Sequence, residues 1–212
     1  TLLASSAASD VYKRQFLAQA THTHRDVNFI GIDISLDILG VARRNIQEAY
    51  GEEQPDNVAL CAYNIERLPQ LFAPGEQVER IYINFCNPWS KNAGSNKHRL
   101  THPRQLLQYR ALMPEGSEIY FKTDDDDLFR DSVEYFPASG YDIEWITYDL
   151  HENEPEWNIR TEHEVMFTEM GIKIKALIAR KKPGADSVTW VDPKVLKRMA
   201  REAAAQEGEG NV

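Results

Sequence analysis

The hydrophobic residues of this chain follow two alternating patterns. Short apolar runs that are rich in β-branched and aromatic residues predict strands, and apolar residues spaced three or four apart predict amphipathic helices. We expect strands at residues 27–33, 58–63, 81–85, 117–123, 143–149 and 172–180. We expect helices at residues 16–22, 36–49, 66–72, 103–113, 124–140, 165–170 and 193–205.

This alternation predicts a doubly wound, Rossmann-like α/β fold. Most of the sheet should be parallel, and the last two strands should form an antiparallel hairpin. Class I S-adenosylmethionine-dependent methyltransferases and dehydrogenases share this pattern. A dehydrogenase is the less favoured of the two, because the sequence contains no Gly-x-Gly-x-x-Gly. In such sheets ligands bind beyond the carboxyl ends of the strands, and polar residues at those ends are therefore the candidate site.

The strand at residues 81–85 leads directly into Asn87-Pro88-Trp89. The stretch from Asn87 to Arg110 contains no Asp or Glu, although the whole chain has 33 acidic and 24 basic residues. Its basic residues are Lys91, Lys97, Arg99, Arg104 and Arg110. A local cationic surface on an acidic protein indicates a phosphate-bearing partner that docks at one place. The alternative is an ordinary Asn-Pro turn followed by a solvated loop.

Three acidic or amide side chains follow other predicted strands. Asp33 ends the strand at residues 27–33, where a carboxylate can accept hydrogen bonds from ribose hydroxyls. Asp33 could instead cap the next helix, but Ser35 is the better cap for the apolar spacing that follows. Asn64 follows residues 58–63, where it would lie beside the edge of an adenine. Of the four residues from Asp124 to Asp127, only Asp124 should face the same edge of the sheet as Asn87. The other three are explained by capping of the next helix, and we expect no metal site there.

Composition restricts the class of protein. With 212 residues, 42% of them hydrophobic, the chain is long enough for one sizeable domain. A net charge of −9 argues against a general polyanion binder, so nucleic-acid contact should be local. Two cysteines, Cys61 and Cys86, form no disulfide framework and fit a reducing cytoplasm. No membrane span or signal peptide is expected.

The two ends of the chain differ from its middle. Residues 1–15 have no convincing periodicity and look like translated cloning sequence, so we expect a non-native leader there. Residues 16–182 should form the catalytic domain. Residues 183–212 should form a polar helical tail, whose last residues are rich in Gly and Glu.

Six segments together resemble bacterial tRNA (guanine-N7-)-methyltransferases of the TrmB type, in the same order and at similar spacing. They are Phe29-Ile30-Gly31-Ile32-Asp33, the run from Ile81 to Lys91, Arg99-Leu100-Thr101-His102, Tyr120-Phe121-Lys122-Thr123-Asp124, Asp149-Leu150-His151 and Thr161-Glu162-His163-Glu164. The resemblance implies transfer of a methyl group from S-adenosylmethionine to N7 of guanine 46 in the tRNA variable loop. It also implies a cytoplasmic monomer or homodimer with tRNA as its partner.

Carried over residue by residue, the resemblance implies three groups of site residues. Asn87 and Asp124 would be catalytic. Asp33, Asn64 and Asn87 would bind the cofactor. Lys91, Lys97, Arg99, Asp124, Thr161, Glu162, His163 and Glu164 would contact tRNA or its guanine.

The chain departs from the family pattern at the catalytic position, in the basic loop and at its beginning. Asn87 stands where members commonly have Asp, Asp33 stands where Glu is usual, and the basic loop is neutral from Asn92 to Asn96. Members carry a glycine loop for the methionine end of the cofactor, whereas residues 1–14 contain no glycine. We therefore expect the first strand and this loop to be missing and S-adenosylmethionine to bind weakly.

The chemistry of N7 tolerates an amide at position 87. This nitrogen has a free lone pair and no proton to lose, so alignment matters more than a general base. Asp124 or Glu162 could balance the positive charge that develops on the base. Two alternatives are an amino-methyltransferase acting on adenine or cytosine and a tRNA-binding fragment without catalysis.

Overall fold

A computed structural model describes residues 2–5, 15–89, 94–184 and 188–191. The strands are β1 (Leu2–Ser5), β2 (Phe29–Asp33), β3 (Val58–Ala62), β4 (Arg80–Asn84), β5 (Glu118–Thr123), β6 (Tyr141–Thr147) and β7 (Lys175–Lys181). The α-helices are α1 (Gln15–Thr23), α2 (Leu36–Tyr50), α3 (Pro103–Leu112), α4 (Asp126–Ala138) and α5 (Glu162–Glu169). Two short 3-10 helices are η2 (Ile65–Gln70) and η3 (Asn96–His98).

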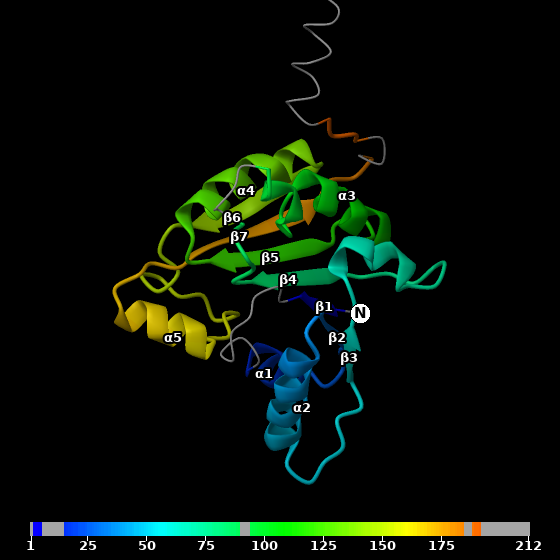
Figure 1. The fold of residues 1–212 in the computed structure, drawn as a ribbon, viewed down its shortest axis with the longest axis vertical. Coiled ribbons are helices and arrows are strands. Elements are labelled where there is room, and N and C mark those ends of the chain that lie inside the picture. The colour runs from blue at the N-terminus through cyan, green and yellow to red at the C-terminus, as the bar shows by residue number, and fades with distance from the viewer. Residues whose placement is uncertain (1, 6–14, 90–93, 185–187, 192–212) are drawn as a thin grey trace, which may run out of the picture.

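The strands form one sheet in the order β3-β2-β1-β4-β5-β7-β6. Strands β1 to β5 are mutually parallel, and β7 pairs antiparallel with both β5 and β6. This arrangement confirms the predicted doubly wound sheet with a C-terminal antiparallel hairpin. In Figure 1, α3 and α4 lie on one side of the strands, and α1, α2 and α5 lie on the other.

The expectation of a missing first strand is wrong, because Leu2–Ser5 forms β1 in the middle of the sheet. It pairs with β2 on one side and β4 on the other. Without β1, both neighbouring strands would have unpaired backbone groups. The hydrogen bonds between strands join backbone groups, so a segment without a clear side-chain pattern can form this strand. The expectation that residues 1–15 are non-native stays a prediction. The helix predicted at residues 193–205 lies outside the described residues.

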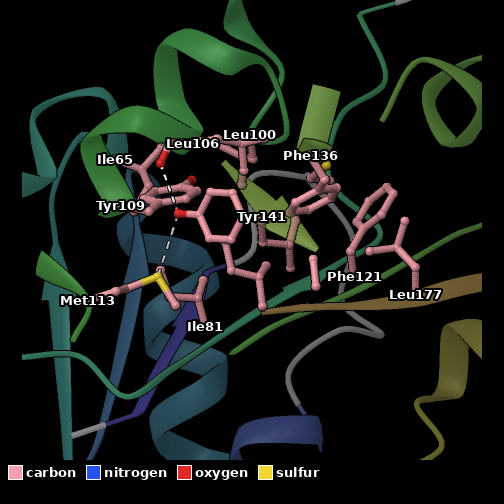
Figure 2. Close-up of a cluster of buried hydrophobic side chains, with 14 of the residues drawn as sticks. Ile65, Ile81, Leu100, Leu106, Tyr109, Met113, Phe121, Phe136, Tyr141 and Leu177 are labelled. Carbon is pink, nitrogen blue, oxygen red and sulfur yellow. Dashed lines mark hydrogen bonds between the residues drawn. The ribbon is translucent and has the colours of Figure 1, made fainter. Parts of the chain in front are cut away.

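Successive side chains of β4 and β5 point to opposite faces of the sheet, so they contribute to two separate parts of the core. Ile81, Ile83, Ile119 and Phe121 join the cluster formed with α3 and α4. Figure 2 shows part of this cluster around Tyr141, whose hydroxyl donates to the Leu106 carbonyl at 3.0 Å. On the opposite face Tyr82 packs on Phe16 of α1, with ring centroids 4.8 Å apart. Among the described residues, no helix has the length and apolar character needed to span a bilayer.

Most helix boundaries follow local capping. Ser35 caps α2 as predicted, and Asp125 caps α4 by accepting from the Leu128 amide at 2.7 Å. The helix expected at residues 66–72 is instead the 3-10 helix η2, because Pro69 interrupts it. Helix α5 begins earlier than expected, at Glu162, since Thr161 and Glu164 form a capping box around its first turn.

Candidate active site at the carboxyl edge of the sheet

Four sequence-predicted site residues follow parallel strands at the same edge of the sheet. Asp33 ends β2, Asn64 follows β3, Asn87 follows β4 and Asp124 follows β5. Because β2 to β5 all run in the same direction, their carboxyl ends meet along one edge. The fold therefore brings together the polar side chains that the sequence predicted as a site.

Asp33 and Asn64 each organise the start of the next helix. Asp33 is 6% exposed, and its Oδ1 accepts from the Ser35 amide at 2.8 Å. Asn64 is exposed, and its Oδ1 accepts from the Glu66 amide at 2.9 Å. Both side chains are therefore fixed in orientation at this edge of the sheet.

Asn87 lies in a strained turn. Its Oδ1 accepts from the Trp89 amide at 2.9 Å, and its side chain is exposed. Phe85 and Trp89, on either side, have φ of 51° and 49°. This left-handed conformation costs an L-residue about 1–2 kcal/mol. Such strain persists only where the surroundings hold it, and it is typical of functional sites.

His163 connects this turn with Asp124 and α5. Its ring is 5% exposed and lies 4.5 Å from the Phe85 ring, measured between centroids. Its Nε2 is 3.7 Å from Oδ1 of the half-buried Asp124. The backbone carbonyl of Asp124 also accepts a hydrogen bond from Lys175 at 2.8 Å. The end of β4, the end of β5 and the start of α5 thus form one packed unit.

The basic stretch contains two kinds of cation. Lys97 and Arg104 are exposed, as expected for a phosphate-binding surface. Arg99 and Arg110 are buried, at 2% and 5% exposure, because each guanidinium serves the protein's own acceptors. The expected tRNA contact by Arg99 is therefore not compatible with its position. Lys91 lies outside the described residues.

The run from Thr161 to Glu164 also turns mostly inward. Thr161 and Glu164 are both 0% exposed and hydrogen bond to one another across the first turn of α5. Glu162 is exposed and accepts a hydrogen bond from Gln15. Of these four residues, only Glu162 presents its side chain to solvent.

Sequence reasoning missed the role of Lys122. Lys122 is 5% exposed, and its ammonium donates to Glu164, to Asn158 Oδ1 at 2.9 Å and to the Ile159 carbonyl at 2.9 Å. Burial lowers the pKa of Lys122, and the adjacent carboxylate of Glu164 opposes that shift. The signal in the sequence was a lysine inside an otherwise apolar strand, which requires a buried counter-charge.

His151, Glu154 and Glu164 also gather near this lysine. Their potential ligand atoms lie within 4.8 Å of one another. Lys122 already pairs with Glu164, and Arg160 pairs with Glu154. The hydrogen bond from Arg160 is the main cause that lowers the pKa of Glu154 to about 2. Because two cations already compensate the two carboxylates, the cluster is poorly suited to a metal ion.

The described residues fit the adenosine part of S-adenosylmethionine. Asp33 and Asn64 supply an acid and an amide at adjacent strand ends, where ribose and adenine groups need acceptors and donors. Residues 6–14, which follow β1, lie outside the described residues.

Comparison with known proteins gives a consistent picture. A family model described as "Putative methyltransferase" matches residues 13–177. A tRNA (guanine-N(7)-)-methyltransferase of Clostridium beijerinckii is 51% identical over 171 residues, which cover 80% of this chain and 78% of the relative. The enzyme of the same name from Clostridium perfringens (strain SM101 / Type A) is 48% identical over the same coverage.

Solved structures with low sequence identity share the fold. The antibiotic-resistance methyltransferase Kmr aligns with a TM-score of 0.56 at 14% identity, covering 86% of this chain and 87% of that one. A methyltransferase structure from Thermoplasma acidophilum aligns with a TM-score of 0.54 at 15% identity, covering 86% of this chain and 69% of that one. These alignments place the chain in the class I methyltransferase fold.

Proposed function

Because this chain belongs to the family of tRNA (guanine-N(7)-)-methyltransferases, we propose that it methylates N7 of guanine 46 in the variable loop of tRNA. S-adenosylmethionine supplies the methyl group as an electrophile. The observation that carries the proposal is that His163, at the start of α5, contacts both Asp124 and Phe85 of the turn that carries Asn87. We expect the enzyme to be cytoplasmic. We also expect it to act as a monomer or a homodimer, and light scattering would distinguish these two states.

The residues at this edge suit a reaction that needs alignment. N7 of guanine offers its lone pair directly, so no side chain has to remove a proton first. The exposed side-chain amide of Asn87 can orient the base, because the hydrogen bond from the Trp89 amide holds that side chain in one orientation. Methylation leaves a positive charge on the base, which the carboxylates of Asp124 and Glu162 would stabilise.

Contact with tRNA would rest on the exposed cations of the basic stretch. Lys97 and Arg104 present their side chains to solvent, unlike Arg99 and Arg110. Phosphate contacts of this kind make affinity fall steeply with salt. We propose that Lys97 and Arg104, together with Lys91, supply the electrostatic part of tRNA binding.

The direct test is the modified nucleoside itself. Purified protein would be incubated with methyl-labelled S-adenosylmethionine and a tRNA transcript, which is then digested to nucleosides and analysed by mass spectrometry. A transcript with adenine in place of guanine 46 is the matched control. We expect 7-methylguanosine from the first transcript alone. N6-methyladenosine would indicate an amino-methyltransferase, and tRNA binding without any methylated product would indicate a binding fragment.

A further inference from the structure

Arg99 lies inside the protein, between the turn at Asn87 and helix α4. Its Nε donates to the Pro88 carbonyl at 2.6 Å. Its Nη1 donates to Oδ2 of Asp131 on α4 at 2.5 Å. One rigid guanidinium therefore ties the backbone of the turn to a helix of the core, and its planar fork can hold both acceptors at once.

The turn needs an external restraint of this kind. Phe85 and Trp89 both adopt positive φ, at 51° and 49°, in a segment of only five residues. The Phe85 end is held by its amide, which donates to the Lys122 carbonyl at 2.8 Å. A guanidinium only donates hydrogen bonds, so Arg99 holds the other end through the Pro88 carbonyl.

Arg99 differs from its charged neighbours in what it can reach. It is 2% exposed, and Asp131 compensates its charge. Lys97 and Arg104 are exposed on the same basic stretch. A buried and paired cation contributes little to phosphate contacts, whereas the exposed cations contribute to the salt dependence of binding.

We infer that Arg99 is a positioning residue, which acts with Asp131 through the Pro88 carbonyl to set the orientation of Asn87. It therefore governs turnover and leaves tRNA affinity unchanged. This inference rests on the proposed function for its kinetic consequence. Its structural consequence, a loosened turn when the clamp is weakened, can be measured without activity.

The kinetic test compares Arg99→Lys and Asp131→Asn with Lys97→Ala and with the surface control Arg44→Ala. Lysine keeps the charge of Arg99 but cannot hold two acceptors in one plane. We expect Arg99→Lys to lower kcat at least tenfold, with KM for tRNA within twofold and the salt slope of binding unchanged. Lys97→Ala should reduce the salt slope by about one unit. Arg44→Ala, at an exposed position of α2, is the control that should leave kcat within twofold. The double variant Arg99→Lys/Asp131→Asn should be no slower than Arg99→Lys alone, because both changes break one clamp.

Thiol reactivity provides the measurement that needs no activity. Cys86 is 3% exposed and lies within the turn, so its reaction with Ellman's reagent reports how often the turn opens. In a Cys61→Ser background, Arg99→Lys should accelerate this reaction at least tenfold, and Lys97→Ala should not change it. Asp131→Asn should give a smaller acceleration and serves as the second variant if Arg99→Lys does not fold.

Two results would overturn the inference. One is unchanged Cys86 reactivity in folded Arg99→Lys and Asp131→Asn. The other is a reduced salt slope with normal kcat in Arg99→Lys, which would make Arg99 a phosphate contact. If the parent protein forms no 7-methylguanosine, the proposed function fails, and the thiol measurement still decides whether Arg99 holds the turn.

Discussion

The buried pair of Lys122 and Glu164 offers a sharp test of how β5 is joined to α5. Both side chains are nearly inaccessible, at 5% and 0% exposure. We consider Lys122→Met, which keeps much of the apolar stem but removes the ammonium. Glu164 then retains hydrogen bonds from Thr161 and Asn158 but loses its ion pair with the Lys122 ammonium. Asn158 and Ile159 each lose a donor as well.

The expected loss of stability is large for a single side chain. Removing one partner of a buried ion pair costs about 3–5 kcal/mol, because it leaves a buried charge without compensation. This is a substantial part of the total stability of a typical domain, about 5–15 kcal/mol. In the double variant Lys122→Met/Glu164→Gln no charge remains buried, so we expect it to be about 1–3 kcal/mol more stable than Lys122→Met.

Urea unfolding at pH 7, followed by tryptophan fluorescence, measures these differences. The matched control is Arg130→Met, which removes a cation from an exposed pair with Asp127. Such surface pairs contribute about 0–1 kcal/mol, so the control should unfold close to the parent. A Lys122→Met protein within 1 kcal/mol of the parent would refute the reasoning. So would a double variant less stable than Lys122→Met.

Four further outcomes are expected. Asn87→Asp should change kcat less than tenfold, or about 1.4 kcal/mol, and a thousandfold change in methylation assays would show that charge at this position matters. The carboxylate of Glu154, whose pKa is lowered to about 2, contributes stability above about pH 4.5 that is lost as pH falls toward 2. Between these pH values the unfolding free energy of Glu154→Gln should therefore fall by about 1 kcal/mol less than that of the parent, and Glu156→Gln is the control. Tyr141→Phe should lower the unfolding free energy by about 1 kcal/mol in urea, since it removes a buried hydrogen bond. Calorimetric titration should show weak S-adenosylmethionine binding by this chain and tighter binding after a glycine-rich segment replaces residues 6–14, whereas micromolar binding by the unchanged chain would contradict this.

The sequence predicted the sheet and its site edge because both depend on local patterns. Strand after strand ended at a polar residue, and the structure places Asp33, Asn64, Asn87 and Asp124 at one edge. The cap at Ser35 also followed from its neighbours alone. The expectation that the first strand is missing was wrong, because central strand pairing uses backbone groups, which a short segment without a distinctive pattern can supply.

Charge signs along the chain did not reveal which charges reach solvent. Sequence alone determined that a stretch from Asn87 to Arg110 carries only basic charge. Tertiary structure decided that Arg99 faces Asp131, 32 positions away, and that Lys122 faces Glu164, 42 positions away. Desolvation makes such distant partners necessary, since a buried ion without one is too costly. The identity of the partner depends on how helices pack across the sheet, and no local pattern records that.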